Sequence, residues 1–189
     1  MPRPAILPVI DWKGVFDSGQ RFAEWVKGGE HRDNCERIRA DLAALSVEPH
    51  EAAYLEALPR PIHVVAIAEA WCGDVVRHVA VLERLAHAAP NIAVRYIGRG
   101  QRPDVFVRFL TNGGEAIPKF IFLSGAFVEC GNWGPMPAAC RELIARGKAC
   151  GNVAAAREKV AALYNADPDR RIVIAELLHL IGVASSSRP

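Results

Sequence analysis

A chain of 189 residues with 51% hydrophobic residues is long enough to bury one sizeable core, which predicts an ordered globular protein. Its 23 basic and 21 acidic residues give a formal net charge of +2, and without a basic stripe this balance disfavours nucleic acid as a partner. No apolar run approaches the roughly 20 residues that a membrane-spanning helix needs, so we expect no membrane partner.

The five cysteines are an odd number and are widely spaced, so they do not form a disulfide scaffold. The sequence has no C-x-x-C or H-x-x-x-H pair with zinc-ligand spacing, and we expect neither a metal nor a cofactor. Its first residues lack the long apolar segment of a secretory signal. We therefore predict a cytoplasmic protein with reduced thiols.

The first 61 residues have helical patterns. Phe22, Trp25 and Val26 have the i, i+3, i+4 spacing of a buried helical stripe, and Pro49 suits the first turn of a later helix. The Pro59-Arg60-Pro61 segment then interrupts the helical pattern. We predict an N-terminal helical extension over residues 1–61.

The pattern changes at residue 62, where a short β-branched run to residue 68 is typical of a strand buried on both faces. Further strands are predicted at 92–97, 118–123 and 127–130. Helices are predicted from Gly73, from a cap at Asp104 and from Pro135 to about residue 146. The order β-α-β-α-β-β-α predicts an α/β fold over residues 62–147, a mixed four-stranded sheet flanked by helices.

Two more helices are predicted in residues 148–189, which we expect to form a C-terminal helical extension packed on the same domain. Asn152 can cap the first helix, and Asp167-Pro168 suits the start of the second. The second helix is apolar around most of its circumference and must therefore be buried. It can pack on this chain's own core or form a homodimer with a second copy, and both alternatives stay open.

The segment Trp71-Cys72-Gly73-Asp74-Val75 follows the first predicted strand and opens the next helix. Unpaired N–H groups and the helix dipole at that position favour the thiolate of Cys72, so we expect a nucleophilic sulfur. The other four cysteines fall within helix or strand patterns and are expected to be structural thiols.

This strand followed by Trp-Cys-Gly resembles the active-site motif of the thioredoxin superfamily, Trp-Cys-Gly-Pro-Cys. Ala116-Ile117-Pro118-Lys119 resembles the Ile-Pro-Thr segment of that family, whose proline follows a cis bond beside the active cysteine. The resemblance implies a thioredoxin-like fold in which Ile117 and Pro118 contact substrate. The longer pattern, with Leu-Thr-Asn-Gly-Gly and Trp-Gly-Pro, resembles a bacterial thioredoxin-like branch.

Three departures from the family pattern bear on the chemistry. Val75 stands where the family has its second cysteine, and Ala66 stands where the family has a buried acid. The usual dithiol cycle therefore cannot run within the motif. Asp74 replaces the family's proline, and a carboxylate beside the thiol opposes thiolate formation.

Supporting roles are expected for Trp71, Gly73, Asp74 and Glu69 around Cys72. Glu69 is close enough in sequence to act as an acid–base group, and a solvated or capping carboxylate is the alternative. Trp71 is expected to shield the sulfur. Trp133 either lines the same face or belongs to the core.

Two functions remain open from the sequence. The first is a monothiol oxidoreductase, in which Cys72 forms a mixed disulfide with a protein or glutathione disulfide and an external thiol resolves it. The second is a non-catalytic binding module that keeps the fold and holds a peptide between Trp71 and Pro118. Whether the chain is an enzyme depends on which of these holds.

Overall fold

The computed structural model describes residues 7–186, so the extreme N-terminus considered above lies outside the described residues. Short helices come first: α1 (Trp12–Asp17), α2 (Phe22–Gly28), α3 (Arg32–Ala44) and α4 (Pro49–Glu56). The alternating region follows as β1 (Ile62–Ile67), α5 (Gly73–His87), β2 (Ile92–Ile97), α6 (Pro103–Phe106), the 3₁₀ helix η1 (Val107–Phe109), β3 (Lys119–Ser124), β4 (Glu129–Trp133) and α7 (Ala138–Ala149). The chain ends in α8 (Val153–Ala166) and α9 (Arg171–Ser185).

The strands form one mixed sheet in the order β2-β1-β3-β4. Strand β1 runs parallel to β2, with Ile62 opposite Ile92, because the crossover helix α5 returns the chain to the same end of the sheet. Strand β3 runs antiparallel to β1 and pairs with β4 as a hairpin. The predicted mixed four-stranded sheet is therefore confirmed.

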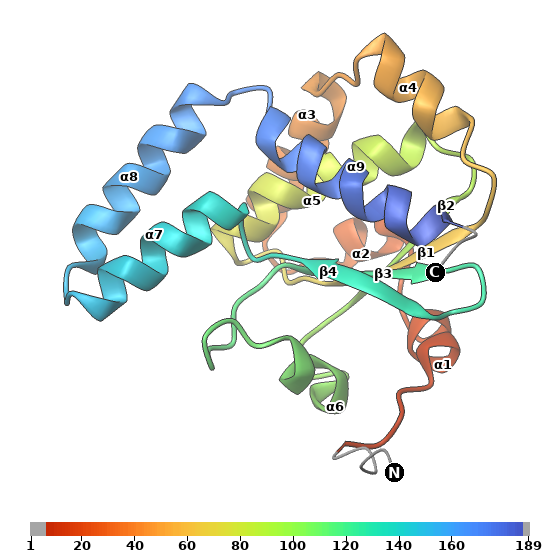
Figure 1. Ribbon diagram of the computed structural model, residues 1–189, viewed down its shortest axis with the longest axis horizontal. Coiled ribbons are helices and arrows are strands. Elements are labelled where there is room, and N and C mark those ends of the chain that lie inside the picture. The colour runs from red at the N-terminus through yellow and green to blue at the C-terminus, as the bar shows by residue number, and fades with distance from the viewer. Residues whose placement is uncertain (1–6, 187–189) are drawn as a thin grey trace.

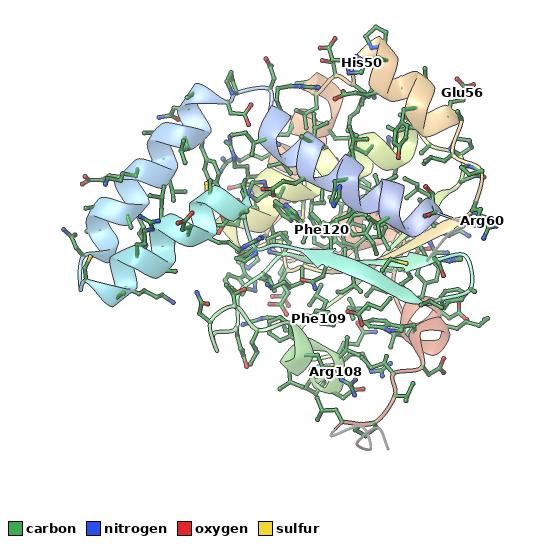
Figure 2. All side chains as sticks on the ribbon, in the orientation of Figure 1. His50, Glu56, Arg60, Arg108, Phe109 and Phe120 are labelled. Carbon is green, nitrogen blue, oxygen red and sulfur yellow. The ribbon has the colours of Figure 1, made fainter. Side chains whose placement is uncertain are left out.

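Helices cover both faces of this sheet (Figure 1). Helices α5 and α9 lie on one face and α1 and α6 on the other. Figure 2 shows Phe120 on the side of α9 and Phe109 on the side of α6. On the first face, Phe120 stacks on Trp133 with their ring centroids 5.3 Å apart. On the second face, Phe16 of α1 meets the ring of His63 edge-on.

The N-terminal helices pack against the sheet and α5. Trp25 of α2 stacks on Tyr96 of β2 with a centroid distance of 4.7 Å, and Val26 is buried against Cys35 of α3. Helix α3 packs along α5 and buries Ile38 completely. These contacts are the ones expected from the apolar stripes, since each stripe places its side chains on one face of a helix.

Several predicted element ends differ from the structure; for example, α9 begins at Arg171 rather than at Asp167-Pro168. Strand β4 begins at Glu129, because Phe127 has a φ of +59° and belongs to the hairpin turn. Helix α7 begins at Ala138, because Pro135 follows a cis peptide bond in the preceding loop. Asp104 lies in the first turn of α6 rather than at its cap.

Helix α9 buries its apolar face on this chain. It contacts β1, β3, β4 and α5, and its buried side chains include Val173, Ile174, Leu177 and Ile181. Those residues motivated the homodimer, which stays a prediction. Within residues 7–186, no helix is both long enough and apolar enough to cross a membrane.

Candidate active site at Cys72

Cys72 lies at the junction of β1 and α5 and caps the N-terminus of α5 with its extended backbone. Its amide donates a hydrogen bond to the carbonyl oxygen of Glu69, which closes the turn between strand and helix. The sulfur Sγ donates to the carbonyl oxygen of Ile117 at 3.4 Å. The Ile117–Pro118 bond that follows is cis. Two segments 45 residues apart in sequence thus meet at one thiol.

The electrostatics of Cys72 differ from what the helix terminus alone predicts. Burial raises the pKa of the thiol, and the carboxylate of Asp74 raises it further. The amides of Val75 and Asp74 and the charge of Arg99 lower it, but burial has the largest effect and the pKa lies above its ordinary value. Loss of hydration thus outweighs the N-terminal amides and acts against the thiolate that the helix terminus favours.

A groove of about 340 Å³ opens beside the sulfur. Three segments form it: the turn that carries Trp71, Cys72 and Asp74, the loop from Thr111 to Ile117, and the start and inner face of α7. Apolar side chains dominate its floor and walls, and they are Trp71, Ile117, Pro135, Met136 and Ile144. Such a surface suits an extended or apolar ligand segment laid across the thiol.

Asp74 is held at the edge of this groove by the C-terminal helices. The Tyr164 hydroxyl of α8 donates to Oδ1 of Asp74 at 3.3 Å, and it also lies 3.1 Å from Nε2 of the buried His78. Burial raises the pKa of the Asp74 carboxyl, while the Tyr164 hydrogen bond and Arg77 oppose that rise. Asp74 is thus a partly buried carboxylate next to the thiol.

The carboxylate of Glu69 is bonded to Trp71 and Arg99, and its acid–base role stays a prediction. Its carboxylate accepts from Trp71 Nε1 at 2.8 Å and from the amide and Nε of Arg99 at 3.0 Å each. Glu69 lines a neighbouring hollow rather than the groove of Cys72. It positions Trp71 and Arg99, and the Arg99 guanidinium lies 5.1 Å from the centre of the Trp71 ring.

The remaining candidate residues lie beside the groove or in the core. Gly73 and Pro118 flank the site without lining the groove, and Trp133 is buried in the core, where its indole N–H bonds to Glu176. Val75 and Ala66 are fully buried, and their alkyl side chains supply neither a thiol nor an acid. The other four cysteines are free and do not line the groove.

Sequence reasoning missed the contribution of α7 and α8. The groove wall from Met136, Arg141 and Ile144 and the Tyr164 contact to Asp74 come from segments that have no motif of their own. The only available signal was the Trp-Gly-Pro segment that precedes α7. Gly134 in that segment has a φ of +118°, and a Cβ there would lie 2.0 Å from the Pro118 carbonyl oxygen, so only glycine lets the two loops approach.

A thiol at a helix N-terminus beside a cis-proline, on a sheet of order β2-β1-β3-β4, defines the thioredoxin-fold class. A thioredoxin family model matches residues 19–154, and the chain belongs to this family. No curated protein matches the sequence.

Two solved structures share the fold. A protein of unknown function from Pseudomonas aeruginosa is 21% identical with a TM-score of 0.71, and the match covers 92% of this chain and 98% of that one. An HIV epitope-scaffold is 22% identical with a TM-score of 0.70 and the same coverage of both chains. At this identity the likeness extends to the fold alone.

The charge of Asp74 is expected to slow the reaction of Cys72. Because the carboxylate raises the pKa of the thiol, Asp74→Asn should move the pH profile of Cys72 alkylation by iodoacetamide to lower pH. Peptide mapping of the alkylated Cys72 at several pH values measures this shift. Glu115→Gln, which removes another carboxylate of the groove, should leave the profile unchanged. A shift to higher pH in Asp74→Asn would contradict the assignment.

Proposed function

We propose that this chain is a monothiol oxidoreductase, in which Cys72 exchanges with a disulfide bound in the apolar groove. The observation that carries the proposal is the position of Sγ, which is part of the groove lining and lies 3.4 Å from the Ile117 carbonyl oxygen. A substrate segment laid along Ile117 would bring its own sulfur to this thiol. The disulfide of a protein or of glutathione is the class of substrate, and thiols resolve the product.

The exchange needs no cofactor, because each bond broken is matched by a bond formed. Cys72 gives up its proton to solvent, and the thiolate attacks one sulfur of the substrate disulfide. The substrate S–S bond breaks as the bond to Cys72 forms, and the released thiolate takes up a proton. Since Val75 supplies no second thiol, an external thiol attacks the mixed disulfide and restores Cys72.

A second candidate function is a binding module that holds a peptide in the same groove without chemistry. The raised pKa of Cys72 favours it, because a protonated thiol is a poor nucleophile at neutral pH. The apolar residues at positions 66 and 75 favour it as well, since a dithiol enzyme needs polar groups there.

Intact-mass analysis after exposure to oxidised glutathione separates the two candidates. A single-thiol exchange protein should gain one glutathione at Cys72, more quickly at higher pH, and lose it when reduced glutathione is added. Cys72→Ser should abolish that adduct, whereas Cys150→Ser, which removes an exposed cysteine outside the groove, should retain it. No adduct on Cys72 at any pH, located by peptide mapping, would refute the exchange function and leave the binding module.

A further inference from the structure

A second hollow adjoins the groove of Cys72. It measures about 420 Å³ and shares Thr111, Asn112 and Arg141 with the groove, so the two hollows lie next to each other at the start of α7. Lys119, the residue after the cis-proline, forms part of its lining. Its remaining lining is mostly polar, in contrast to the apolar groove.

Lys119 and Arg141 point their charges at the same backbone oxygen. Lys119 Nζ donates to the Gly134 carbonyl oxygen at 2.9 Å and to Thr111 Oγ1 at 2.6 Å, and Arg141 Nη1 lies 3.4 Å from the same Gly134 oxygen. An ammonium group has three donors, so Lys119 retains one for which residues 7–186 provide no acceptor. Both known acceptors of Lys119 are neutral.

No carboxylate compensates these two cations within residues 7–186. Glu142, the nearest acid in the lining, forms its ion pair with Arg146 instead. The acids of the adjoining groove are also engaged, Asp74 with Tyr164 and Glu115 with Arg99. The lysine is 4% exposed, and burial together with Arg141 lowers its pKa to about 8. A bound anion would relieve that unfavourable placement of two like charges.

We propose that the hollow lined by Lys119, Arg141 and Thr111 binds an oxyanion, a carboxylate or phosphate group, of the molecule that lies over Cys72. The proposal rests on the proposed function for the location of that molecule, and it narrows the substrate class to disulfides that carry a negative charge near the reacting sulfur. Arg141 lines both hollows, so it is the residue that links the anion to the thiol. Lys119 supplies the buried charge.

Two aromatic disulfides that differ in charge test whether the site favours anionic substrates. One is dithiobis-nitrobenzoate, which bears a carboxylate on each half, and the other is the neutral dithiodipyridine. The rate of reaction at Cys72 is obtained by subtracting the rate of the Cys72→Ser variant from the rate of the wild type. Lys119→Met and Arg141→Gln should each lower the anionic-to-neutral rate ratio by about tenfold, the expected loss for one charge-assisted hydrogen bond.

Arg157→Gln is the control, because it removes an exposed positive charge of α8 that lies outside both hollows. Its rate ratio should change by less than about twofold, since an exposed charge is screened. An unchanged ratio in both Lys119→Met and Arg141→Gln would overturn the anion site while leaving exchange at Cys72 intact. Arg141→Gln keeps the test decisive if the buried Lys119 variant fails to fold.

A titration that does not use Cys72 chemistry separates this proposal from the proposed function. Acetate and inorganic phosphate are added to the Cys72→Ser variant, and the backbone amide signals of Thr111 and Gly134 are followed by NMR. A saturable shift with either anion, weakened about tenfold in the Arg141→Gln background, supports the site and identifies its preferred group. No saturable shift with either anion overturns it, even if Cys72 exchanges disulfides.

Discussion

Acidification below pH 6.5 is expected to weaken the fold through His78, by up to about 1.4 kcal/mol of unfolding free energy per pH unit. His78 is fully buried, and burial together with the charges of Arg77 and Arg170 lowers its pKa from 6.5 to about 3. The unfolded chain therefore binds one more proton than the folded chain between pH 6.5 and pH 3. Stability falls across this window as the pH falls.

The surroundings of His78 do not stabilise a protonated ring. Nε2 contacts the Tyr164 hydroxyl at 3.1 Å, and the ring meets Trp133 edge-on. Its Nδ1 has no hydrogen-bond partner within residues 7–186. The nearby charges that act on the ring are guanidinium groups, so protonation adds a third positive charge to a buried cluster.

Urea unfolding of the wild type and His78→Gln measures this effect. Glutamine keeps a polar side chain and cannot be protonated, so the stability of the wild type relative to this variant should drop by about 2 kcal/mol between pH 6.5 and pH 5. Equal pH dependence in the two proteins would show that His78 does not titrate this way.

Glu83, on the same helix, changes the stability with pH in the opposite direction to His78 and provides an internal control. Burial raises the pKa of its carboxyl from 4.5 to about 7, although the Tyr96 hydroxyl bonded to it at 2.7 Å partly opposes that rise. The folded chain therefore binds more protons between pH 7 and pH 4.5, and stability from this group rises as the pH falls. The two contributions offset each other in the wild type, so Glu83→Gln should be more acid-labile than the wild type.

Leu177→Ala is expected to cost about 2–5 kcal/mol of unfolding free energy, the range for deleting a buried leucine side chain. Leu177 is fully buried in α9, whose apolar face lies on β3, β4 and α5. Val183→Ala on the same helix is the control, because Val183 is 43% exposed and its loss should cost less than about 1 kcal/mol. Thermal or urea unfolding of the three proteins measures the difference.

Unfolding measured at several protein concentrations also tests the predicted homodimer. If the helix packs only on its own chain, the unfolding midpoint of the wild type should not depend on protein concentration. A midpoint that rises with concentration, with a dimer by light scattering, would indicate that a second copy contributes to the stability of α9.

Local patterns in the sequence predicted most of the elements. The β-branched run at β1 and the spacing of Val76, Val79 and Leu82 in α5 depend only on the period of a strand or a helix, so neighbouring residues determine them. The errors fell at element ends, as at Phe127 and Pro135, where a positive φ or a cis bond interrupts the pattern. Neither feature changes the hydrophobic period from which the ends were predicted.

The meeting of Cys72 with Ile117 was expected only from the family resemblance, and the structure brings them together. The sequence alone thus determined which thiol stands at the helix N-terminus and that Val75 gives it no partner. Tertiary structure decided its electrostatics, because burial of the sulfur has the largest effect on its pKa and raises it. The physical reason is that helix-terminus amides act over a few adjacent residues, whereas desolvation depends on segments brought together from distant parts of the chain.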